Sequence, residues 1–147
     1  MNKVIVKVVG SQLDAAGEEN SIKMMAEGRH YYRSGKHYIL YDDPDLGKEK
    51  GSSTLLKVAE DSITLLRRGE VTQEQYFAKH KESTSVYRTP YGSLDLSVRT
   101  KAIDIAYGSV SGNIDIVYAM SVNGTWQSDN KLHIEICAAG TENNKLN

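Results

Sequence analysis

Between residues 89 and 137 the hydrophobic and polar residues alternate with a period of two, which is the pattern of strands that bury one face. Two tight turns divide this stretch. The first, at residues 89–92, has proline in its second position and glycine in its last. The second is Asn123-Gly124, a pair that favours the type I′ turn of a β-hairpin. The pattern therefore predicts three consecutive antiparallel strands.

The same alternation continues toward the N-terminus. We expect a first strand over residues 3–13, a hairpin of strands 22–33 and 36–43 around Ser34-Gly35, a break at residues 42–45, and a strand over 71–79. Residues 54–68 fit either a helix or two short strands, 54–59 and 62–68. Their β-branched residues favour the strands.

The long strand expected over residues 94–107 changes phase. Its apolar residues occupy even positions as far as Val98 and odd positions from Ile103, so we expect a β-bulge near Lys101. A bulge bends a strand, and about nine or ten strands joined by hairpins exceed what a flat open sheet carries comfortably. Closing the sheet removes its edges. The predicted fold is all-β, a single antiparallel up-and-down barrel of about 8–10 strands.

Composition limits the kinds of partner. A chain of 147 residues is one domain by length, and we expect a barrel over residues 1–137 with a disordered tail over 138–147. The net charge of −1 offers no broad basic field for a nucleic acid. No run of 18 apolar residues is present to cross a membrane. A lone cysteine, Cys137, rules out an internal disulfide and predicts a cytoplasmic location.

Several segments of the chain, in this order and spacing, resemble the YwiB-like family of uncharacterised bacterial β-barrel proteins. Thr-Pro-Tyr-Gly at residues 89–92 is the most distinctive of them. The resemblance implies a calycin barrel, related in shape to lipocalins and fatty-acid-binding proteins, with strands rather than a helix at residues 54–68. It implies no activity. The matching segments are residues 27–28, 39–42, 54–58, 66–69, 87–92 and 121–124.

Metal binding and catalysis have little support. The four histidines show no ligand spacing, although a turn at Ser34-Gly35 would make His30 and His37 diagonal neighbours on one face. No nucleophile motif is present, and only Tyr87 and Thr89 offer a phenol near a hydroxyl. We therefore expect no metal and no cofactor. An enzyme of unknown reaction is the third hypothesis, after the two that follow.

The first hypothesis is that the protein binds a small molecule or peptide inside or at the mouth of the barrel, because a small barrel either is filled by side chains or holds one small ligand. The chain has nine tyrosines, whose rings are apolar and whose tips are polar. Alternation directs Tyr118 inward and gives Arg67 the parity of Ile63. A buried guanidinium needs a partner such as Glu27, or a ligand anion. The predicted ligand-binding residues are Glu27, Tyr41, Arg67, Tyr87 and Tyr118.

The competing interpretation leaves Arg67 solvated and uses Tyr118 to fill the core. The barrel would then be a packed structural or interaction module. An aromatic patch from Tyr31 and Tyr32 opposite Tyr38 would allow a homodimer, and ordinary cross-strand aromatic pairing explains the same pattern. A cavity of about 300 Å³ or more with converging polar groups would favour the ligand over the module.

Overall fold

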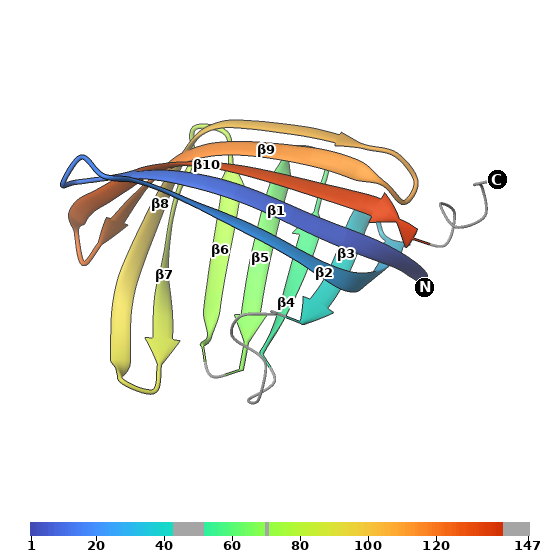
Figure 1. Ribbon diagram of the computed structural model, residues 1–147, viewed down its shortest axis with the longest axis horizontal. Helices are drawn as coiled ribbons and strands as arrows, with labels where there is room; N and C mark the ends of the chain where they lie inside the picture. The colour runs from blue at the N-terminus through green and yellow to red at the C-terminus, as the bar shows by residue number, and fades with distance from the viewer. Residues whose placement is uncertain (43–51, 70, 140–147) are drawn as a thin grey trace.

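The structure is a computed structural model that describes residues 1–42, 52–69 and 71–139, and ten strands follow one another along it (Figure 1). All neighbouring pairs are antiparallel, and β1 also pairs with β10. The strands are β1 (Asn2–Asp14), β2 (Glu19–Arg33), β3 (Lys36–Asp42), β4 (Ser53–Val58), β5 (Ser62–Arg68), β6 (Gln73–Ala78), β7 (Glu82–Thr89), β8 (Gly92–Tyr107), β9 (Gly112–Val122) and β10 (Thr125–Ala138).

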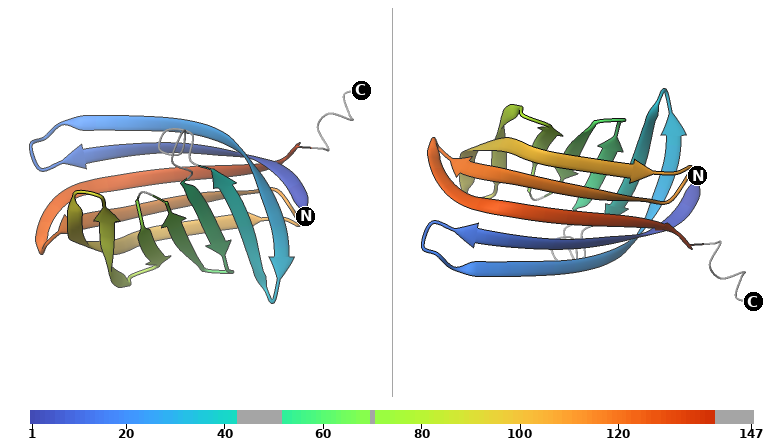
Figure 2. Two further views of the ribbon diagram at one scale, coloured as in Figure 1. Left: turned by 90° about the horizontal axis from the view of Figure 1, so that it is seen from below. Right: turned by 90° about the horizontal axis from the view of Figure 1, so that it is seen from above.

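The sheet runs in the order β6-β5-β4-β3-β2-β1-β10-β9-β8-β7. Its two end strands, β6 and β7, are consecutive in the chain and lie next to each other, so the sheet curls into a nearly closed barrel. The views in Figure 2 show the short strands β3–β7 lying across one side of the long strands. The predicted all-β, up-and-down antiparallel barrel is confirmed, including both strands expected in residues 54–68.

Two corner strands produce the curvature. The first part of β2 pairs with β1 and its last part with β3, and the two pairings overlap at residues 28–30. Gly28 lies at this corner, where an added Cβ would be 2.9 Å from the carbonyl oxygen of Leu40. In β8 the register shifts between Thr100 and Ala102, which confirms the bulge predicted near Lys101. A bulged strand bends and twists, so β8 can follow the curve of the barrel while it pairs with β7 and β9.

The tight turns have the expected backbone. Ser34 and Gly35 have φ angles of 53° and 81°, and Asn123 and Gly124 have 50° and 87°. Positive φ at both central positions is what a type I′ hairpin turn requires. The predicted break at residues 42–45 falls, beyond Asp42, outside the described residues. The predicted tail over residues 138–147 also lies, beyond residue 139, outside the described residues.

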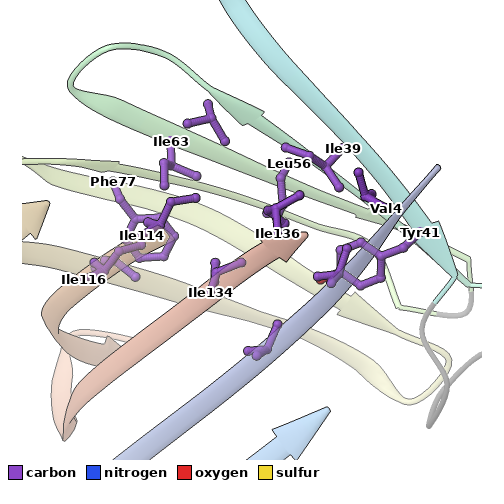
Figure 3. Close-up of a cluster of buried hydrophobic side chains, with 14 residues drawn as sticks. Val4, Ile39, Tyr41, Leu56, Ile63, Phe77, Ile114, Ile116, Ile134 and Ile136 are labelled. Carbon is purple, nitrogen blue, oxygen red and sulfur yellow. The ribbon is translucent and has the colours of Figure 1, made fainter. Parts of the chain in front are cut away.

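Aliphatic side chains from opposite sides of the barrel meet in its interior (Figure 3). Val4, Ile39, Leu56, Ile114 and Ile136 each expose 1% or less of their surface. They come from five different strands, because alternate residues of every strand point inward. The interior is therefore filled by side chains in this region, and the hollows of the described surface are open grooves.

Candidate functional site

The hydrogen-bond ladder of the barrel is interrupted between β6 and β7. At one end Thr72 and Arg88 form an isolated bridge, with Thr72 N donating to Arg88 O at 3.0 Å and Arg88 N donating to Thr72 O at 2.9 Å. At the other end Lys81 N donates to Ala78 O at 3.0 Å. Between these points no backbone hydrogen bond joins the described residues of the two strands. We call this interval the β6–β7 slit.

Backbone polar groups of both strands face the slit. In an antiparallel ladder the N–H and C=O of alternate residues point to the same neighbouring strand. Because Thr72 and Arg88 exchange both bonds, the groups of Glu74 and Tyr76 on β6 point toward β7, and those of Thr84 and Val86 on β7 point toward β6. None of these groups has a backbone partner among the described residues. The slit therefore offers two short, unpaired strand edges.

The inner wall next to the slit is polar. Gln75 exposes 3% of its surface, and neither its Nε2 nor its Oε1 has a hydrogen-bond partner among the described atoms. The register of the Thr72–Arg88 bridge, continued along both strands, places Gln75 opposite Ser85, whose buried Oγ is also without a partner. A buried polar group left unpaired costs roughly 1–3 kcal/mol. This region therefore differs from the aliphatic core cluster that fills the middle of the barrel.

An open groove of about 460 Å³ follows the slit on its outer side. Side chains from β5, β6 and β7 line it, and Ser85 is reached from it. Its charged residues are Arg67, Arg68, Arg88 and Glu74, so positive charge predominates. The arrangement supplies hydrogen-bond donors, acceptors and positive charge, which are the means of binding a polar molecule.

Four of the predicted ligand-binding residues lie on the inner face of the barrel, and three of them, Arg67, Tyr87 and Tyr118, belong to β5, β7 and β9. Arg67 also lines the groove, and it donates to Thr54 Oγ1 and Gln73 Oε1, each at 3.4 Å. Tyr87 is half-buried on the inner face of β7, the strand that forms one side of the slit. Tyr118 packs edge-on against Phe77 with ring centroids 5.1 Å apart, and burial raises its pKa.

The fourth inner residue is Tyr41, which is 6% exposed and packs in the core, and only Glu27 points outward. Glu27 and Tyr41 line a groove of about 590 Å³ over β1, β2 and β3. Glu27 is exposed on the outer face, because Ala26 and Gly28 take the inner positions of β2. Arg67 faces inward on β5, with β3 and β4 between, so the expected pairing of Glu27 with Arg67 is not present. The alternation of β2 is weak in the sequence, which hid the outward direction of Glu27.

Four residues beside the slit, Gln75, Ser85, Thr72 and Arg68, were not among the predicted ligand-binding residues. A signal was available for Gln75: it shares the parity of Phe77, which predicts an inward direction for a polar side chain. No comparable signal exists for Ser85. Its importance depends on the missing ladder, and ladder pairing between edge strands cannot be seen in residue order.

Thr89, half of the one candidate catalytic pair, is occupied in turn formation. Its Oγ1 accepts from Tyr91 N at 3.0 Å and donates to Gly92 O at 3.2 Å. The threonine hydroxyl thus stabilises the turn predicted at residues 89–92.

A separate polar cluster lies where β2, β3 and β8 meet. His30 and His37 are diagonal neighbours, as predicted, and their Nε2 and Nδ1 atoms are 2.9 Å apart. The Tyr107 ring stacks on that of His37 at 3.9 Å. Burial lowers the pKa of both histidines, and the charge of His37 and of the N-terminus lowers that of His30 further. No group of three or more His, Cys, Asp or Glu within the described residues is arranged to hold a metal.

Ten antiparallel strands, a filled core and one interrupted seam define this protein as a small up-and-down β-barrel protein. The chain belongs to the family described as a domain of unknown function (DUF1934), whose profile matches residues 6–134. It is 31% identical over 115 residues to the uncharacterized beta-barrel protein YwiB of Bacillus subtilis (strain 168), covering 78% of this chain and 79% of that protein.

The fold agrees with a solved structure as well. The crystal structure of the ywiB protein from Bacillus subtilis superposes with a TM-score of 0.82 at 24% sequence identity, covering 94% of this chain and 92% of that one. The resemblance seen in the sequence is therefore confirmed, and with it the barrel. Neither description names a ligand or an activity.

Proposed function

We propose that this barrel binds a small polar molecule carrying amide groups, and that the ligand lies in the β6–β7 slit. The observation that carries the proposal is the buried side chain of Gln75, with both amide atoms unpartnered beside an interrupted ladder. A ligand amide both donates and accepts hydrogen bonds. It can therefore pair with the strand edges and satisfy Gln75 or Ser85 in the same position.

The filled core supports a site in the wall of the barrel rather than at its centre. Barrels of lipocalin shape hold one small ligand when the interior has room, and here the interior is occupied by aliphatic side chains. The groove along the slit, at about 460 Å³, exceeds the roughly 300 Å³ of the smallest typical ligand pockets. Of the residues predicted from the sequence, Arg67 lines this groove and Tyr87 belongs to β7, one of the two strands of the slit.

The test is a titration of the ¹⁵N-labelled protein with N-acetylglycinamide, a neutral molecule with two amide groups, followed by ¹H–¹⁵N NMR. We expect the largest shifts at the amides of Glu74, Tyr76, Thr84 and Val86. Gln75→Leu should weaken these shifts because it removes the buried amide. Gln127→Leu changes an exposed glutamine in the same way and serves as the matched control.

Absence of shifts at the four slit amides at about 10 mM probe, a concentration that reveals even millimolar affinity, would refute the proposal. Equal shifts in the wild type and in Gln75→Leu would refute the role of Gln75. Shifts centred on the β1–β2–β3 groove would instead assign binding to the neighbourhood of Glu27 and Tyr41.

The second candidate is a packed interaction module, and the filled interior favours it. Tyr31 and Tyr38 stack with ring centroids 4.8 Å apart and rings 2° from parallel, and Tyr32 is exposed beside them. A homodimer through this face remains a proposal. It predicts that Tyr32→Ser lowers the mass measured by light scattering at high protein concentration, and an unchanged monomer mass in the wild type would contradict it.

The location and the remaining partners are proposals of the same kind. A cytoplasmic barrel without a nucleic-acid partner is consistent with one cysteine and a net charge of −1. In the part of the chain that the structure describes, no helix has the length and apolar character needed to span a membrane.

A further inference from the structure

We infer that the ligand of the slit ends in a carboxylate, which is bound between Arg68 and Arg88 at the Thr72 end. The chemical class is an acylated amino acid or short peptide with a free carboxyl group. This inference rests on the proposed function and adds the charged end that decides the ligand's direction in the slit.

The register of three strands brings the two arginines to one residue. The β5–β6 ladder ends at the pair Arg67–Gln73, and its register, continued by one residue, would bring Arg68 opposite Thr72. On its other side Thr72 bridges Arg88. Arg68 and Arg88 therefore flank Thr72 on the outer face, and both line the groove together with Thr72. Residues opposite each other on neighbouring strands have Cβ atoms about 4.5–5.5 Å apart.

Neither arginine is neutralised within the described residues. No ion pair joins Arg68 or Arg88 to Glu74, which lies one step further along the same face. Arginine holds carboxylates through paired N–H···O bonds, which are roughly twice as strong as bonds between neutral groups. The hydroxyl of Thr72, which lines the same groove as the two arginines, adds a donor for the same anion.

The strand edges suit the rest of such a ligand. Beyond the arginines, the next residues facing the slit are Glu74 and Val86, then Tyr76 and Thr84. An extended dipeptide spans at most about 7 Å, and two residues on a strand edge cover a similar length. The exposed rings and methyl groups of Tyr76 and Val86, with 41% and 38% of their surfaces accessible, offer apolar contacts to its side chains.

The length of the ligand is limited because the slit is closed at both ends. The Thr72–Arg88 bridge closes one end and the turn from Ala78 to Lys81 closes the other. A long chain cannot run through the opening along the strands. A short acyl-peptide fits between the two closures with its carboxylate at the arginine end.

The experiment compares N-acetyl-dialanine, which has a free carboxylate, with N-acetyl-dialaninamide, which is neutral and otherwise the same. We expect the acid to bind about tenfold more tightly in NMR titrations of the wild-type protein. Arg88→Gln and Arg68→Gln should each bring the ratio of the affinity for the acid to that for the amide toward one, without abolishing binding of the amide. Arg33→Gln removes the same charge at the β2–β3 turn and should leave the ratio unchanged.

Equal affinity of acid and amide in the wild type would overturn the carboxylate site and leave the proposed function standing. Failure of both probes to shift any slit amide would overturn both. A ratio lowered equally by Arg33→Gln would show a general charge effect and overturn the arginine pair. Binding of a capped hexa-alanine acid as tight as that of the dialanine acid would overturn the limit on length.

Discussion

The β1–β10 seam and the β6–β7 seam close the same barrel in opposite ways. Eleven residue pairs join β1 to β10 in unbroken register, whereas a single bridge joins Thr72 to Arg88. Most inner residues beside the first seam are aliphatic, such as Val6 and Ile136. The buried polar side chains at its end, Ser128 and Asn130, are hydrogen-bonded to each other at 3.1 Å. Those beside the second are Gln75 and Ser85, with polar atoms that find no partner in the described structure.

The difference separates stability from binding. A continuous ladder over an apolar face satisfies every backbone group and removes hydrocarbon from water, so the β1–β10 seam stabilises the fold. The interrupted seam leaves hydrogen-bonding groups unused, at a cost in free energy. The barrel tolerates this cost because the core cluster draws side chains from strands on both sides of the interior.

The largest effect is expected from shortening an inner side chain at the continuous seam. Ile136→Ala should lower the free energy of unfolding by about 2–5 kcal/mol, because Ile136 exposes 1% of its surface and its cavity cannot refill. Urea denaturation measures this loss. Val86→Ala, at the edge of the slit, should change it by less than about 0.5 kcal/mol. Similar losses for both variants would erase the contrast between the seams.

A smaller loss is expected where the backbone at the start of β9 meets Tyr107. A Cβ on Gly112 would lie 2.5 Å from Cδ2 of Tyr107, so Gly112→Ala should cost about 1–3 kcal/mol by overpacking. Gly108→Ala is the control, since its Cβ would meet nothing nearer than the Ser111 carbonyl oxygen at 3.4 Å. Thermal unfolding of both variants measures these stability changes. A loss of stability confined to Gly108→Ala would be incompatible with the packing described.

At the slit we expect a change of the opposite sign. Gln75→Leu should raise the free energy of unfolding by about 1 kcal/mol, because it replaces an unpaired buried amide with an apolar group of similar size. Gln127→Leu, on the surface, should have little effect. A marked loss of stability in Gln75→Leu would mean that the amide is satisfied in solution, and the polar character of this seam would then be structural.

The smallest effect concerns pH and the imidazole pair. The pKa values of His30 and His37 are lowered in the folded protein from 6.5, mainly by burial. Below pH 6.5 the unfolded chain therefore binds protons that the folded protein does not, and stability should be full above this pH and fall as the pH drops. Melting temperatures from pH 7.5 to 5 test this.

His30→Gln should flatten the decline in melting temperature, whereas His133→Gln, on the outer face, should keep it. A melting temperature of the wild type that is constant on acidification would remove the basis of this prediction. Both histidines lie on β2 and β3 rather than on the strands of the slit, so this response does not test the β6–β7 seam.

Much of the fold was predictable because its determinants are local. Asn123-Gly124 and Ser34-Gly35 specify their turns through the φ angles they tolerate, and the phase change before Ile103 reveals the bulge. Strong alternation correctly predicted that Tyr118 points into the barrel. The expected pairing of Glu27 with the inward Arg67 was wrong, because alternation in β2 is weak and a one-residue change of parity reverses the face.

The slit was not predictable from residue order. Whether β6 and β7 complete a ladder depends on how the twist and bend of ten strands bring the two end strands together. Arg68 and Arg88 are twenty positions apart in the chain, and the registers of β5, β6 and β7 place both beside Thr72. Two arginines that are remote in the chain thus became a candidate anion site only through the arrangement of the strands.

The sequence by itself determined the strands, their turns, their antiparallel succession and the apolar character of the inner faces, because each depends on neighbours within a few residues. The tertiary structure decided where the ladder stops, which polar side chains are buried beside that gap, and which charges meet across it. These features come from contacts between strands remote in the chain, and their geometry is set by the closure of the whole barrel.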